Sequence, residues 1–224
     1  MSTQFNPHRG ARTLAIAVTL LVPALPFAAH AAPAPSGQAH LAQAMGEKGE
    51  DAYDNALAGK WSLVSKAATQ LQSSNAQLPA RWHVLRDQFG LTRSVRGLQL
   101  AAASHNKWAA AGAANGVTLF AARLEQPTKP TIPTEVTLLD VYGRALQVAG
   151  GRGDVVAARR ALGSLDSTWI MIRPRVLRQG GTVAAKRFDI ALHRARVANS
   201  AQKMGAASTP ILDQVDFLEK VFTH

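Results

Sequence analysis

The second half of this sequence carries a concentration of arginines, whose characteristic chemistry is the binding of anions. Between Asp140 and Lys203 there are twelve basic residues against four aspartates, a surplus of eight positive charges. Guanidinium groups bind phosphate and carboxylate oxygens through paired, directional hydrogen bonds. The alternative interpretation is a basic surface that is only solvated. The residues predicted to form an anion-binding face are Arg173, Arg175, Arg178 and Arg187.

The sequence contains none of the common motifs for catalysis or for covalent attachment of a cofactor. There is no Gly-x-Ser-x-Gly motif, no phosphate-binding loop and no conspicuous pair of carboxylates. The glycines of Gly151-Arg152-Gly153 follow no predicted strand, which argues against a dinucleotide-binding loop. The chain contains no cysteine, which excludes a Cys-x-x-Cys-His haem attachment. We therefore predict no catalytic residue, no metal site and no cofactor, and we do not expect an enzyme.

A cofactor held without covalent bonds between helices is the alternative function. Helical bundles commonly house haem or metal ions between facing helices. A methionine and a histidine that converge, for example Met45 with His193, would supply the two ligands of a haem iron. On this alternative the protein is a periplasmic metal- or haem-binding bundle engaged in electron transfer or metal handling.

The spacing of apolar residues predicts an all-α fold. From Val155 to Val176 apolar side chains recur every three or four residues, which places them on one stripe of a helix. A similar stripe runs from Trp61 to Leu85, with Asn75 as its single polar member. Short glycine-containing turns follow the predicted helix ends and favour antiparallel neighbours. The predicted fold class is an antiparallel helical bundle.

The two halves of the chain resemble each other. The segments Asp51–Leu57 and Asp140–Leu146 are identical at four of seven positions, at an offset of 89 residues. Between the halves, three prolines in seven residues are incompatible with a continuous helix. We predict a duplication, with helical units at residues 38–126 and 134–224 joined by a Pro-rich linker at residues 127–133.

The N-terminal residues have the three parts of a secretory signal peptide. Arg9 and Arg12 precede an apolar stretch from Leu14 to Ala29, and Ala29-His30-Ala31 provides the small residues of a cleavage site. The stretch is shorter than the roughly 20 apolar residues of a membrane-spanning helix. We predict a signal peptide at residues 1–31, a Pro/Ala tether at residues 32–37, and a bacterial periplasmic or secreted protein with no transmembrane segment after cleavage.

The predicted export and the positive charge together indicate which partners to expect. The chain has a formal net charge of +11, and removal of Arg9 and Arg12 with the leader leaves 23 basic against 14 acidic residues, or +9. An exported protein rarely meets nucleic acid, and no stacking aromatic side chains are interleaved with the arginines. We therefore expect a non-catalytic protein that binds an anionic component of the cell envelope or an acidic protein partner.

Overall fold

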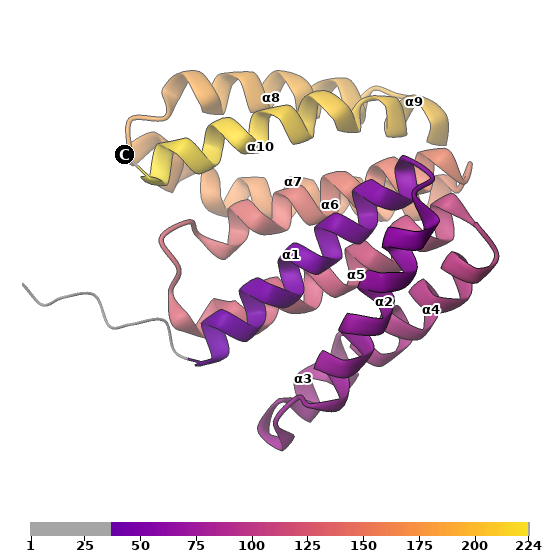
Figure 1. The fold of residues 1–224 in the computed structure, drawn as a ribbon. Helices are drawn as coiled ribbons and strands as arrows, with labels where there is room; N and C mark the ends of the chain where they lie inside the picture. The colour runs from indigo at the N-terminus through magenta and orange to yellow at the C-terminus, as the bar shows by residue number, and fades with distance from the viewer. Residues whose placement is uncertain (1–36, 224) are drawn as a thin grey trace, which may run out of the picture. The chain divides into compact units, whose positions relative to one another are not determined.

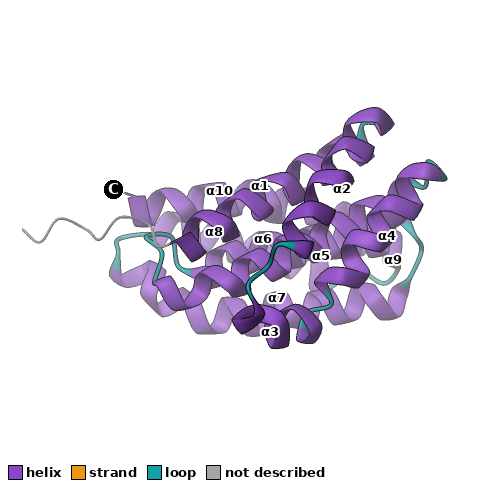
Figure 2. Ribbon diagram, turned by 60° about the horizontal axis from the view of Figure 1, so that its bottom comes forward, coloured by secondary structure: helices purple, strands orange, loops and turns teal. Residues whose placement is uncertain are grey.

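The chain is helical throughout the part that the structure describes. The computed structural model describes residues 37–223, so the predicted signal peptide and residues 32–36 of the predicted tether lie outside it. Within residues 37–223 there are helices and short loops but no strands (Figures 1 and 2). The predicted all-α fold is confirmed. None of these helices is both long enough and apolar enough to cross a bilayer.

Four long helices of the first half pack in a ring, which we call the first ring. Helix α1 packs on α2 and α5, and α4 closes the ring by packing on the same two helices. Their apolar faces enclose one core, in which Met45, Leu71, Leu98 and Phe120 are fully buried. The helices are α1 (Gly37–Leu57), α2 (Trp61–Ala76), α4 (Leu91–Ala103) and α5 (Lys107–Glu125).

The apolar stripe predicted from Trp61 to Leu85 is divided among three elements. Helix α2 ends at Ala76, and a 3-10 turn, η1 (Ala80–Trp82), and the short helix α3 (His83–Gln88) follow. Pro79 has no amide hydrogen, and its ring disfavours a helical conformation at the residue before it. The prediction of a single continuous helix over this stripe was therefore wrong.

Four helices of the second half form a second ring. Helix α6 packs on α7 and α10, and α8 packs on the same two helices. The predicted helix from Val155 to Val176 is confirmed as α7, which the Asp154 carboxylate caps by accepting the Ala157 amide hydrogen at 2.9 Å. The elements are α6 (Thr134–Gly151), α7 (Val155–Arg178), α8 (Thr182–Arg196), the short α9 (Ala201–Ala206) and α10 (Ser208–Thr223).

Helix α6 connects the two rings. The chain reaches it from α5 through a second 3-10 turn, η2 (Gln126–Thr128), and the two helices pack on each other. Val148 of α6 belongs to the first core, whereas Leu139 and Leu146 belong to the second. The order in which neighbouring helices pack is the same in both rings, and the duplication itself stays a prediction.

Two glycines allow α6 and α9 to approach within backbone contact. A methyl group at Gly150 would lie 2.5 Å from the Cα atom of Gly205 and 2.9 Å from the carbonyl oxygen of Ala201. Both neighbours are backbone atoms, which rotamer changes cannot move away. Gly163, in the interior of α7, is by contrast exposed and has no atom near the position of an added methyl group.

We expect Gly150→Ala and Gly163→Ala to have opposite effects on stability. The first overpacks a helix crossing and should lower the free energy of unfolding by about 1–3 kcal/mol. The second only reduces the freedom of the unfolded chain and should raise the free energy of unfolding by about 0.5–1 kcal/mol. Urea unfolding followed by circular dichroism measures both. Equal effects of the two substitutions would contradict the close crossing of α6 and α9.

Candidate functional site

The carboxylate of Asp189 holds α7 and α8 together. The indole nitrogen of Trp169 donates a hydrogen bond to Asp189 Oδ1 at 2.7 Å, and Arg173 donates to Oδ2 at 2.8 Å. Partial burial raises the pKa of Asp189, but these hydrogen bonds and the positive charges nearby outweigh that effect, so its pKa lies below the ordinary value. The Trp169 ring also packs on Phe188 of α8, with ring centroids 4.4 Å apart. Arg173 is therefore already paired with a carboxylate of the chain itself, Asp189.

A second ion pair joins the same two helices and uses their other acidic residue. Arg196 lies 2.8 Å from Asp166. Asp166 and Asp189 are the only acidic residues in α7 and α8, so no carboxylate of these helices remains for the other basic side chains. Seven basic residues of α7 and α8 form no ion pair with any described residue: Arg159, Arg160, Arg175, Arg178, Lys186, Arg187 and Arg194.

The four arginines predicted to bind an anion occupy different places on the second ring. Arg173 pairs with Asp189, as described above. The guanidinium of Arg175 lies over the ring of Phe222, 5.3 Å from its centroid, and that of Arg187 lies over Phe217 at 5.6 Å; both rings belong to α10. Arg178 is exposed in the last turn of α7. The four do not gather around one point, and their role in anion binding stays a prediction.

Exposed apolar side chains accompany this basic surface, and sequence reasoning missed them. Of the twelve large apolar side chains that are exposed within residues 37–223, eight lie on α7, on α8 or directly after α8. A signal was present in the sequence, because Val183, Ile190 and Val197 recur every seven residues, as do Ile170 and Leu177. Ile170 is 68% exposed and Ile190 is 48% exposed. We call these side chains and the seven unpaired basic residues the α7–α8 face.

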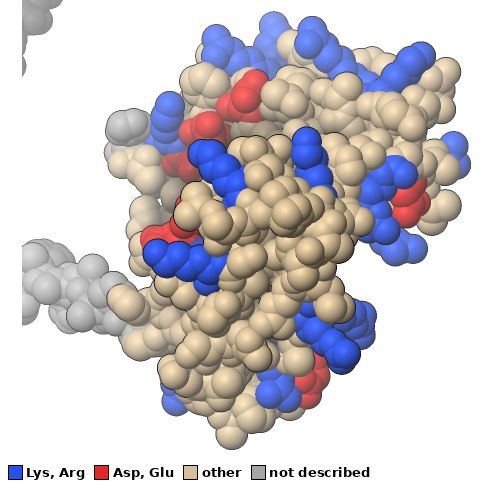
Figure 3. Space-filling view, turned by 45° about the vertical axis from the view of Figure 1, so that its right-hand side comes forward, with Lys and Arg blue, Asp and Glu red and all other residues tan. Residues whose placement is uncertain are grey.

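Basic side chains follow the edge of the second ring at which α8 lies. Figure 3 shows Lys and Arg side chains along the upper edge of the molecule, where α8 lies in Figure 1, with few acidic side chains among them. Large apolar side chains are exposed on the same two helices, so the face combines two properties. It carries unpaired positive charge along both helices, and it exposes aliphatic groups that gain free energy when they leave water.

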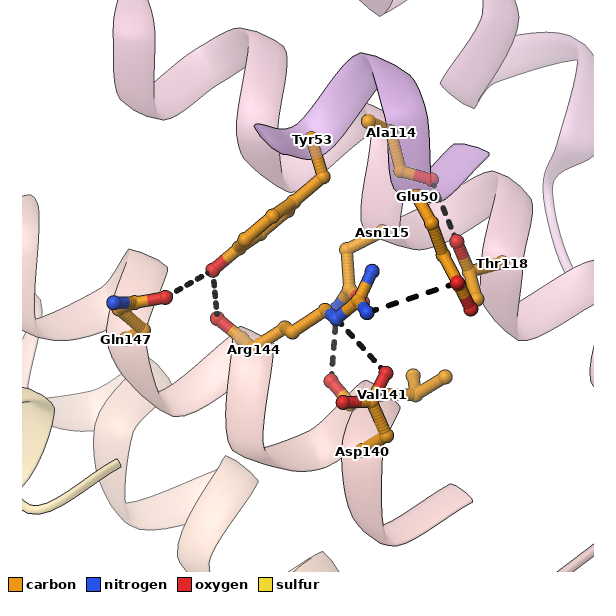
Figure 4. Close-up of polar contacts among 9 residues, drawn as sticks. All are labelled: Glu50, Tyr53, Ala114, Asn115, Thr118, Asp140, Val141, Arg144 and Gln147. Atoms are coloured by element: carbon orange, nitrogen blue, oxygen red, sulfur yellow. Dashed lines mark hydrogen bonds and ion pairs between the residues drawn. The ribbon is translucent and has the colours of Figure 1, made fainter. Parts of the chain in front are cut away.

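A second polar cluster lies where α1, α5 and α6 meet, and Arg144 is at its centre (Figure 4). Its Nε atom is 2.8 Å from Asp140 of the same helix, and its Nη2 atom is 3.9 Å from Glu50 of α1. The guanidinium also lies over the ring of Tyr53, 5.2 Å from the centroid. The Tyr53 hydroxyl donates to the side chain of Gln147 at 2.5 Å. This cluster, which we call the Arg144 junction, joins the two rings.

Helix α5 contributes a buried amide to the same region. Asn115 donates a hydrogen bond to the carbonyl oxygen of Val141 at 2.9 Å. Its own carbonyl oxygen and the Nη1 atom of Arg144 are buried without a hydrogen-bond partner among the described residues. The junction thus fixes the positions of three helices with polar contacts, at the cost of two unsatisfied groups.

Burial changes the acidity of the carboxylates around Arg144. It raises the pKa of Glu50 and of Asp140 by more than the Arg144 charge lowers them. Burial also raises the pKa of Glu219 on α10, and the negative charges of Asp140 and Asp216 add to the increase. These carboxyl groups therefore hold their protons more tightly in the folded chain than in the unfolded chain.

The alternative of a cofactor between helices gains no support from the positions of its candidate ligands. Met45 is fully buried in the first core, whereas His193 is exposed on α8 in the second ring. Nowhere in residues 37–223 do three or more histidine, aspartate or glutamate side chains gather in a way that would hold a metal ion.

Comparison with known proteins gives no relative for this chain: no family model, no curated protein and no solved structure matches it. The function must therefore be inferred from the α7–α8 face and the Arg144 junction themselves.

The raised pKa values predict how stability depends on pH. A carboxyl group with a raised pKa in the folded state destabilises the fold when it is ionised. Its contribution to the free energy of unfolding therefore grows as the pH falls from neutral through the folded-state pKa, and is complete below the unfolded value of about 4. We expect the double variant Glu50→Gln with Glu219→Gln to show a smaller increase in stability as the pH falls from neutral to about 4.

Urea unfolding at a series of pH values measures this effect. Glu47→Gln is the matched control, because Glu47 is an exposed glutamate of α1 outside the junction. The control should keep the pH dependence of the unaltered chain. An unchanged pH dependence in the double variant would contradict the assignment.

Proposed function

We propose that this chain is an exported, non-catalytic binding protein whose α7–α8 face docks on an anionic lipid surface of the bacterial cell envelope. One observation carries the proposal. Seven basic residues of two adjacent helices have no ion-pair partner in the described part of the chain, and large apolar side chains are exposed on the same two helices. A helix surface of this composition binds at the boundary between lipid headgroups and acyl chains.

Each component of the face has a distinct part in docking. The aliphatic side chains of Ile170 and Ile190 would enter the outer part of the acyl layer, where they leave water. The long Arg and Lys side chains reach from the same helices to lipid phosphates while their methylene groups stay in apolar surroundings. Attraction between the basic residues and anionic headgroups decreases with salt, because exposed charges are screened.

A lipid surface accounts for the composition of this face better than a protein partner does. Strong protein interfaces rely on aromatic anchors seated in pockets, but the aromatic side chains of α7 and α8, Trp169 and Phe188, are buried. A second copy of the chain would bring one basic face against another. The unpaired charges are distributed from Arg159 to Arg194 along two helices, which matches a partner that is anionic over a continuous area.

The predicted signal peptide supports the same proposal, because export brings the chain to envelope membranes. The proposed location is the periplasm or the outside of the cell. An acidic protein or an acidic polysaccharide remains the competing occupant of the face, and the experiment below separates these partners from lipid.

The experiment is sedimentation of the purified exported chain with vesicles. We expect the chain to bind vesicles that contain phosphatidylglycerol, to bind pure phosphatidylcholine vesicles far more weakly, and to dissociate as salt is raised. The double variant Ile170→Ser with Ile190→Ser should bind anionic vesicles roughly tenfold more weakly, because two aliphatic groups no longer gain from leaving water.

The matched control is the double variant Leu63→Ser with Leu100→Ser, which removes two exposed leucines from the first ring. Its vesicle binding should equal that of the unaltered chain. Binding that does not distinguish the two lipid compositions would overturn the proposal. Retention by an acidic protein or polysaccharide without any binding to anionic vesicles would also overturn it.

A further inference from the structure

A groove between α8 and α10 has the composition of a binding site for one anionic group. It is an open hollow of about 160 Å³ on the flank of α8 that faces α10. Two positive charges, an amide and an apolar wall meet there. The residues that line it are Arg187, Ile190, Ala191, Arg194, Pro210 and Gln214.

The two arginines of the groove are available to a ligand. Arg187 and Arg194 are seven residues apart and therefore lie on the same side of α8. Neither forms an ion pair with a described residue. The Arg187 guanidinium lies over the face of Phe217, and Lys220 lies over the same ring at 5.0 Å from its centroid. The contact with the ring leaves the hydrogen-bonding capacity of the Arg187 N–H groups unused, because an aromatic face attracts the cation without accepting its N–H groups as an oxygen does.

Gln214 adds a requirement that a simple anion does not meet. Its side-chain oxygen is buried and has no hydrogen-bond donor among the described residues, so a ligand in the groove reaches it once the side-chain amide turns outward. A buried acceptor without a partner is unfavourable. A ligand that carries a hydroxyl beside its negative charge would donate the missing hydrogen bond. The apolar wall of Ile190, Ala191 and Pro210 would contact the carbon atoms that join the hydroxyl to the charged group.

We propose that this groove binds the phosphate ester of a small polyol. The phosphate oxygens accept hydrogen bonds from Arg187 and Arg194, and a hydroxyl of the polyol donates to Gln214. The phosphoglycerol headgroup of an anionic lipid and free glycerol phosphate share this chemistry. The inference names the headgroup that the α7–α8 face selects, and in this respect it rests on the proposed function.

The first arm of the test compares vesicles of equal charge. Vesicles with equal mole fractions of phosphatidylglycerol or phosphatidylmethanol carry the same net charge, but only the first has hydroxyl groups in its headgroup. We expect about fivefold tighter binding to phosphatidylglycerol, as one additional hydrogen bond gives. Gln214→Leu should reduce this preference while binding to phosphatidylmethanol vesicles is retained.

Charge-matched double variants separate the groove from the rest of the face. Arg187→Gln with Arg194→Gln should abolish the preference for phosphatidylglycerol. Arg159→Gln with Arg160→Gln removes the same charge from α7, so it should weaken binding to both vesicles and keep the preference. Thermal unfolding checks that each variant is folded.

The second arm uses soluble probes in an NMR titration of the full exported chain. Glycerol 3-phosphate should perturb the groove residues at lower concentration than inorganic phosphate does, and Arg187→Gln with Arg194→Gln should abolish the difference. If glycerol 3-phosphate binds in this way but the chain does not bind vesicles, the groove is a site for a soluble phosphate ester. That outcome would overturn the proposed membrane function but not the proposed site.

Two results would overturn the site. One is equal binding to the two anionic vesicles together with equal effects of glycerol 3-phosphate and phosphate, which would leave the membrane function intact. The other is a preference for phosphatidylglycerol that survives the Arg187→Gln and Arg194→Gln changes.

Discussion

The carboxylate of Asp189 is the interaction on which the exposed surface of the second ring depends. It accepts hydrogen bonds from Trp169 and Arg173, so one acidic group of α8 links two side chains of α7. Asp166 serves the same two helices through Arg196. Because both carboxylates are used in this way, the remaining basic residues of the two helices have no counterion there. The ion pairs that hold the helices together therefore also leave the α7–α8 face positively charged.

The Arg144 junction fixes the position of α6, the helix on which α7 packs. Helix α6 contributes to both cores, and Arg144 connects it to Glu50 of α1 while remaining paired with Asp140. Buried ion pairs contribute little net stability compared with apolar contacts, but removal of one partner is costly. The junction therefore defines how the rings fit more than it adds to their stability. In a chain without cysteine, this fit depends entirely on packing and on such contacts.

The sequence predicted the helices well because periodicity reports burial within one element. The apolar stripe from Val155 to Val176 lies on one helix, α7, which begins after its N-cap residue Asp154. The stripe through Pro79, in contrast, was predicted as one helix and is divided among three elements. Contacts between helices could not be predicted in this way. The position of Arg173 in the sequence does not indicate that it pairs with Asp189 of the next helix. The pairing of Arg144 with Glu50 could not be predicted either, because these residues belong to different halves of the chain. The exposed apolar residues were visible in the sequence, but their exposure follows from which helix faces pack.

The central claim is that the α7–α8 face enters an anionic lipid surface, and the absence of cysteine permits a direct test with single labels. An environment-sensitive fluorophore attached after Ile170→Cys or Ile190→Cys should shift to the blue when phosphatidylglycerol vesicles are added. The same fluorophore after Leu63→Cys or Leu100→Cys, at exposed sites of the first ring, should not shift. A shift confined to the first ring, or no shift at any of the four positions, would contradict the account.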